Sequence, residues 1–226
     1  MTIWVLTGRI GAGKTTALRK IVSLLAKRGL KLAGVLSPSV SDRGGDRIGY
    51  DHVTFEATEG RLRILLGAPF LRKGAPKRKN CSVEVSTSSA LNQPRGGGEA
   101  ESFLIPWSSV RTSRKEPSRL IYRNFIGPYR INRKVLRFTA SCLAGSARKK
   151  DLDLLVIDEL GYLELKGNGF YRALGEAVER GVSLLVVVRR ELLGKVLALP
   201  PLRKEKKHIF RIERDRPHEV AKKIGG

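Results

Sequence analysis

The sequence predicts an α/β domain built around a mainly parallel central sheet. Short apolar runs rich in β-branched residues alternate along the chain with segments that are apolar at three- and four-residue spacing. Glycine-containing turns separate many of these segments, and 226 residues are enough to bury one sizeable core. Because strands that alternate with helices favour parallel pairing, we expect a single domain over residues 1–226 with helices packed on the sheet.

The first part of the chain predicts a strand, a glycine-rich turn and a helix. The run at residues 3–7 is apolar and ends at Gly8, and an apolar face at helical spacing extends from Lys14 to Arg28. Gly29 is placed to end this helix. Further strand-like segments follow at residues 31–36, 47–55 and 61–66.

The pattern changes between residues 72 and 119. A triple glycine at 96–98, a Ser/Thr cluster at 86–89 and scattered prolines leave this segment with little periodicity. Only residues 83–85 and 103–105 are strand-like. We therefore predict an irregular or β-rich insertion here.

Regular structure is predicted again from about residue 120. Apolar strands are expected at 152–157, 182–188 and 208–212, and helices at 132–143, 169–180, 191–199 and 217–224. Asn168 is a candidate N-cap for the second of these helices, and Pro217 is suited to the first turn of the last one.

The turn after the first strand carries a phosphate-binding motif. Gly8, Arg9, Ile10, Gly11, Ala12, Gly13, Lys14 and Thr15 fit the Walker A pattern GxxxxGK[ST], with Thr16 following. The glycines let the backbone amides close around phosphate groups, and the amino end of the next helix adds its positive dipole. Lys14 then supplies a charge to the β- and γ-phosphates, and the Thr15 hydroxyl is a ligand for Mg²⁺.

Two acids follow the strand at 152–157, as expected of a Walker B element. Asp158 is predicted to hold the Mg²⁺, and Glu159 to orient a water for in-line attack on the γ-phosphate. The catalytic residues are thus predicted to be Lys14 and Glu159, and the metal residues Thr15 and Asp158. Asp151 and Asp153 precede the strand and are predicted to be solvated ends or caps.

With both motifs in place, the chain resembles the small thermophilic nucleoside-triphosphatase family, which includes cancer-related nucleoside triphosphatase. The matching segments are 7–16, 47–51, 127–129 and 157–165, the last reading IDELGYLEL before Phe170. The resemblance implies a three-layer P-loop NTPase fold and Mg²⁺-dependent hydrolysis of ATP, GTP and other nucleoside triphosphates with broad base specificity.

The chain also departs from this family at three places. Residues 72–119 are longer than the usual connection. Arg189 and Arg190 replace small or polar residues, and Asp215-Arg216 stands where the family has Asn-Arg. Family contacts made from these positions are not carried over to this chain.

The net charge of +23 leaves the partners open. Residues 120–150 hold eight Lys and Arg and no Asp or Glu, which suits a polyanion, whereas a heavily charged surface also suits adaptation to heat. Two alternatives therefore stand beside the hydrolase: a nucleoside or polynucleotide kinase, and a nucleotide-dependent nucleic-acid-binding protein. We expect a cytoplasmic monomer. No signal peptide is expected, because the first residues carry neither a cationic segment nor a cleavage site. No membrane span is expected either, because the most apolar stretch, residues 182–188, is only seven residues long and includes Ser183.

Several other residues carry weaker signals. Arg9, Arg47 and Arg130 are candidate transition-state cations, although a structural or solvated role is favoured for each. Glu164 could pair with a nearby base, although a role in bracing the turn after the acids is favoured. Stacking on a nucleobase is open to Tyr50, Tyr129 and Tyr162, although packing is favoured for each. No chemical role is predicted for His52, His208 and His218. Cys81 and Cys142 lack the spacing of a zinc site.

Overall fold

A computed structural model describes residues 1–41, 44, 47–50, 52–58, 61–65, 82–85, 108–110, 125–126, 129–131 and 133–226. The strand predicted at 103–105 lies outside the described residues, as does Asp51. So do most of residues 120–127, where regular structure is predicted to begin again. No described helix is long and apolar enough to cross a bilayer.

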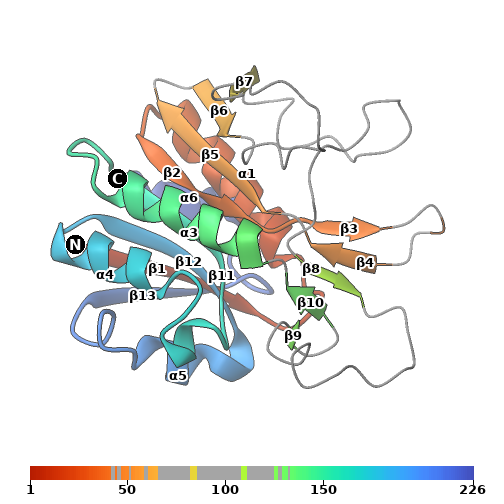
Figure 1. Ribbon diagram of the computed structural model, residues 1–226. Helices are drawn as coiled ribbons and strands as arrows, with labels where there is room; N and C mark the ends of the chain where they lie inside the picture. Colours follow the sequence, from red (N-terminus) through yellow and green to blue (C-terminus); the bar gives the residue numbers. More distant parts are fainter. Residues whose placement is uncertain are drawn as a thin grey trace, which may run out of the picture.

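The main sheet has eight strands in the order β13-β1-β12-β11-β2-β5-β6-β7 (Figure 1). The first five pair in parallel, which confirms the predicted parallel centre, and the other three continue the sheet antiparallel. The parallel strands are β1 (Thr2–Gly8), β2 (Leu32–Leu36), β11 (Leu154–Leu160), β12 (Ser183–Arg189) and β13 (Lys206–Arg211), and the antiparallel ones are β5 (Val53–Thr58), β6 (Arg61–Leu65) and β7 (Ser82–Val85).

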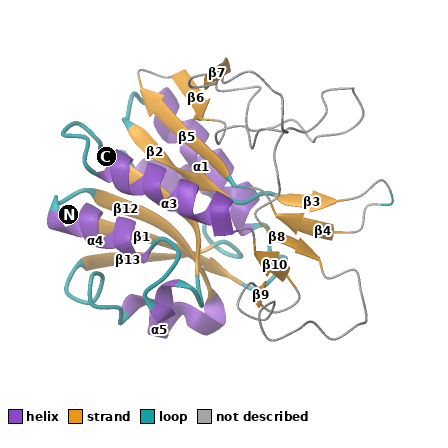
Figure 2. Ribbon diagram, viewed as in Figure 1, coloured by secondary structure: helices purple, strands orange, loops and turns teal. Residues whose placement is uncertain are grey.

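Helices cover both faces of this sheet, as the three-layer prediction requires (Figure 2). The helices α1 (Lys14–Lys27) and α6 (Pro217–Ile224) pack together on one face, and α3 (Arg133–Ala147) and α4 (Tyr171–Glu179) pack together on the other. The short α5 (Leu193–Leu197) contacts β12 on the α4 side.

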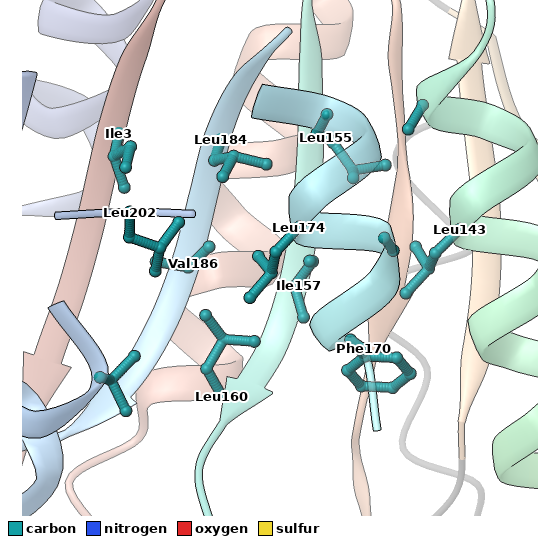
Figure 3. Close-up of a cluster of buried hydrophobic side chains, with 14 of the residues drawn as sticks. Ile3, Leu143, Leu155, Ile157, Leu160, Phe170, Leu174, Leu184, Val186 and Leu202 are labelled. Atoms are coloured by element: carbon teal, nitrogen blue, oxygen red, sulfur yellow. The ribbon is translucent and has the colours of Figure 1, made fainter. Parts of the chain in front are cut away.

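The alternation of apolar residues along the strands builds a separate core on each face. In β11, Leu155 and Ile157 join the core under α3 and α4, where Leu174 and Phe170 pack (Figure 3). Leu154 and Val156 instead join the core under α1 and α6. Strands that are buried on both faces explain the continuous apolar runs of the sequence.

A second, antiparallel sheet has the strand order β3-β4-β8-β10-β9. Its strands are β3 (Ser39–Ser41), β4 (Arg47–Tyr50), β8 (Ser108–Val110), β9 (Phe125–Ile126) and β10 (Tyr129–Ile131). The predicted strand region 47–55 is therefore divided between two sheets, as β4 and β5. The predicted insertion 72–119 contributes β7 to the main sheet and β8 to the second one.

Several predicted boundaries differ from the structure. The strand β11 runs through Asp158 and Glu159 to Leu160, and α3 continues four residues beyond the predicted end. The predicted helix 191–199 consists of a 3₁₀ turn, η2 (Arg190–Leu192), followed by α5. The Asn168 cap was wrong: the N-cap of α4 is Phe170, and Asn168 Nδ2 donates to the carbonyl of Lys166 at 3.0 Å.

Candidate active site

The phosphate-binding motif forms the turn between β1 and α1. Gly8 ends β1, and α1 begins at Lys14. Gly11 and Gly13 have φ angles of 79° and 82°, a left-handed conformation that other residues adopt only at a cost. Gly13 is also the N-cap of α1 and offers no side chain to the first-turn amides. The amides at this helix start are therefore suited to an anion.

Lys14 is held against the turn that it is predicted to serve. Its side chain is buried, and Nζ donates to the carbonyl of Arg9 at 2.8 Å and to that of Gly8 at 3.3 Å. The ammonium group thus lies next to the turn, where an incoming phosphate oxygen can replace a carbonyl as its acceptor.

Asp158, the first acid of the Walker B element, contacts the phosphate-binding turn. Its carboxylate is buried, accepts a hydrogen bond from the Thr15 hydroxyl and is close enough to Lys14 for electrostatic attraction. Its Oδ2 also accepts from the amide of Ser37 at 3.1 Å, and the Ser37 hydroxyl donates to the Asp158 carbonyl. Burial raises the pKa of Asp158 to about 6, against the lowering effect of these hydrogen bonds and of Lys14.

The Thr15–Asp158 contact also tests whether a magnesium ion suits the residues present. The hydrogen-bonded Thr15 hydroxyl and Asp158 carboxylate offer two hard oxygen donors next to each other. This donor set fits Mg²⁺, which binds one or two carboxylates together with substrate phosphates.

Glu159 forms an ion pair that was not predicted from the sequence. Its carboxylate forms an ion pair with Arg189, the last residue of β12, and 26% of the Glu159 side chain is exposed. The strand β12 lies between β1 and β11, so Arg189 comes from the strand that separates the two motifs.

Glu164 braces the turn that follows the two acids, as predicted. It is buried, and its two carboxylate oxygens accept from the amides of Gly161 at 2.7 Å and Phe170 at 2.9 Å. Burial raises its pKa to about 7, although the two amide hydrogen bonds oppose the shift. A Cβ at Gly169 would lie 2.1 Å from this carboxylate, so the brace needs glycine there.

A further acid supports the phosphate-binding turn from the segment after β13. Glu213 accepts a hydrogen bond from the amide of Arg9 at 2.9 Å, which lowers the pKa of this carboxyl. Asp215, by contrast, accepts from the amide of Arg211 at 2.6 Å and closes a local turn, while Arg216 is the N-cap of α6. No sequence motif marks Glu213, so its contact with the turn could not be predicted from the sequence.

The remaining candidates differ in their burial and in whether their side chains are described. Arg9 is exposed, whereas nothing is described of the side chains of Arg47 and Arg130. His52 is buried with Nδ1 3.3 Å from the Thr139 hydroxyl, and burial lowers its pKa to about 3. Half of Tyr162 is exposed, so the favoured prediction that it packs was wrong, and stacking on a nucleobase stays a prediction.

These features define the class of the protein before any comparison. A glycine turn joins the first strand to the first helix and faces a buried acid at the carboxyl end of a parallel strand. This is the arrangement of a P-loop NTPase fold. Comparison with known families identifies the family within this fold class. A family model described as NTPase matches residues 3–92 and 109–225, so the chain belongs to this family, and the predicted resemblance is confirmed.

The curated relatives include archaeal and human proteins. The chain is 26% identical over 222 residues to nucleoside-triphosphatase THEP1 of Methanopyrus kandleri, covering 97% of this chain and 91% of the relative. It is 27% identical over 195 residues to human cancer-related nucleoside-triphosphatase, covering 86% and 78% of the two chains. No solved structure matches the chain.

The family match also reaches into the predicted insertion. Within residues 72–119 it leaves only 93–108 unmatched. The strand β7 lies in the matched part, and β8 straddles its boundary. The bounds of the insertion therefore stay a prediction.

Proposed function

We propose that this chain is a Mg²⁺-dependent nucleoside-triphosphatase that hydrolyses the terminal phosphate of ATP, GTP and other nucleoside triphosphates. The contact between Thr15 and Asp158 is the observation that carries the proposal, because it joins the phosphate-binding turn to the acid pair. The relatives in Methanopyrus kandleri and human are named as nucleoside-triphosphatases, which supports the same activity.

Binding is assigned to the turn and to Lys14. The amides between Ile10 and Thr15, together with the amino end of α1, hold the phosphate tail, and Lys14 exchanges its contacts with the Gly8 and Arg9 carbonyls for phosphate oxygens. Thr15 and Asp158 would hold Mg²⁺, which supplies positive charge to the β- and γ-phosphate oxygens.

Hydrolysis is assigned to Glu159. Its carboxylate comes directly after Asp158 and is partly exposed, so a water can reach it. By accepting a proton from that water, Glu159 orients the oxygen for in-line attack on the γ-phosphorus, and the diphosphate leaves. All of these groups act on the triphosphate, which every nucleoside triphosphate shares, and this favours broad base specificity.

The test of Glu159 is its replacement by glutamine. Glu159→Gln should retain nucleotide binding and lose most turnover, since an amide cannot take the proton of the water. Glu179→Gln, at the exposed end of α4, is the matched control. Turnover that stays at the wild-type level in Glu159→Gln would remove this residue from the mechanism.

A nucleotide panel tests the activity itself. Phosphate released from ATP, GTP, CTP and UTP should require Mg²⁺ and differ little between bases, and the panel should include high temperature. A nucleoside or a polynucleotide 5′-hydroxyl end is added in a parallel reaction. Phosphate that passes to either acceptor faster than to water would favour a kinase over the hydrolase.

A further inference from the structure

Arg189 occupies a central position at the carboxyl edge of the parallel sheet, the edge where the strands end. Its strand, β12, pairs with β1 on one side and with β11 on the other. In the β1–β12 register Arg189 stands directly opposite Gly8, the first residue of the phosphate-binding turn. Its side chain therefore starts between that turn and the acid pair.

The side chain is directed to one of these two neighbours. Arg189 Nε donates to Glu159 Oε1, and this contact is both a hydrogen bond and an ion pair. The ion pair uses Oε1 of Glu159. The other oxygen of Glu159, Oε2, can therefore accept a proton from a water while the ion pair stays intact. Other ion pairs between described residues, such as Arg148–Glu176 and Lys31–Asp151, involve no residue of the predicted site.

The pair is only partly buried, which limits what it can contribute to stability. The Arg189 side chain is 35% exposed and that of Glu159 is 26% exposed. Ion pairs that water can reach contribute little to stability. An arginine Nε–H is, however, a directional donor, and a carboxylate that is free to rotate would spend less time aligned with a water.

We propose that Arg189 is a positioning residue, which holds the Glu159 carboxylate in the orientation that accepts the proton of the attacking water. The inference rests on the proposed function, because it assigns Arg189 an effect through Glu159. It also gives a use to a position where the sequence departs from the family it resembles. Arg189 is not a catalytic residue in this proposal, since it acts through another side chain.

A double-mutant cycle tests this proposal on the full chain. Arg189→Ala should lower kcat for ATP by roughly ten- to hundredfold and leave KM nearly unchanged, as expected when a supporting hydrogen bond is lost. Arg189→Lys, which retains a cation, should restore part of kcat. Arg180→Ala, which removes an exposed arginine before the opposite end of β12, is the control and should match the wild type.

Arg189→Ala made in the Glu159→Gln variant tests whether Arg189 acts through Glu159 or directly on the phosphate. Adding Arg189→Ala to Glu159→Gln should cause little further loss of kcat if Arg189 acts through Glu159. A further loss as large as in the wild-type background would overturn the proposal and place Arg189 on the phosphate instead. A kcat for Arg189→Ala equal to that of Arg180→Ala would also overturn it, as would a drop in thermal unfolding midpoint that alone accounts for the lost activity.

Failure of the proposed function would be recognised separately. In that case wild-type protein releases no phosphate from any nucleoside triphosphate, and the arginine variants have no rate to compare. An active wild type with an unaffected Arg189→Ala variant refutes only the role of Arg189.

Discussion

The brace formed by Glu164 gives a prediction that combines pH with one substitution. An ordinary glutamate has a pKa of 4.5, and burial raises that of Glu164 to about 7. The folded protein therefore keeps this proton up to about pH 7, whereas the unfolded chain releases it near 4.5. The stability that Glu164 contributes is fully present below pH 4.5 and is lost as the pH rises to 7.

The size of this stability change follows from the two pKa values. The effect of a substitution follows from the two amide hydrogen bonds that the carboxyl group accepts. The rise from 4.5 to about 7 corresponds to about 3 kcal/mol of unfolding free energy lost across that range. In Glu164→Gln one terminal oxygen becomes an NH₂ group that faces the amide of Gly161 or Phe170. A buried amide left without an acceptor costs about 1–3 kcal/mol, at any pH.

The wild type and Glu164→Gln should therefore differ most in acid. We expect the variant to be less stable by about 1–3 kcal/mol at pH 5, and this gap to close or reverse by pH 8 because the wild type loses about 3 kcal/mol over that range. Urea unfolding at the two pH values measures both quantities, with Glu179→Gln as an exposed control. A gap of equal size at pH 5 and pH 8 would refute the assignment of the raised pKa to Glu164.

The remaining predictions concern the phosphate-binding turn, the metal and the sheet. Lys14→Ala should weaken ATP binding by roughly ten- to hundredfold through the loss of a charged hydrogen bond, and unchanged affinity in equilibrium titrations would contradict its role. Asp158→Asn should abolish the gain in ATP affinity on adding Mg²⁺, and a gain of wild-type size would exclude Asp158 as a ligand. Gly34→Ala places a Cβ 2.3 Å from the carbonyl oxygen of Val156 and should lower the free energy of unfolding by about 1–3 kcal/mol. Gly175→Ala, in α4 with open space around its Cβ position, should raise it by about 0.5–1 kcal/mol in the same urea experiment, and matching midpoints for the two variants would contradict both estimates.

The elements that the sequence predicted well are those whose signals are local. Residues 2–8 and 14–27 form the strand and helix expected from their spacing, because each buries apolar side chains that recur with the period of its own backbone. The glycine turn between them was equally accessible, since Gly11 and Gly13 adopt the positive φ angles that the motif requires.

The second sheet could not be predicted in this way. Its strands are only two to four residues long, so a period of two is barely visible in any of them. Their partners are also distant in sequence: Gly49 in β4 pairs with Ser109 in β8. Short strands with remote partners are specified by tertiary pairing, which composition and spacing do not record.

The candidate site shows the same division between local motif and long-range contact. The two motifs named Lys14, Thr15 and Asp158, which the structure brings together, but they named neither Ser37 nor Arg189, which hold the acid pair. Ser37 is 121 residues from Asp158, and Arg189 is 30 residues from Glu159.

Strand order explains these two contacts. The strand β11 has β2 on one side and β12 on the other, so Ser37, just after the end of β2, and Arg189, at the end of β12, arrive at the same edge as the acids. In a parallel sheet the carboxyl ends of neighbouring strands always meet at one edge. Once the order of strands is known, the residues that follow the neighbours of the acid strand are therefore the first places to look for groups that position it.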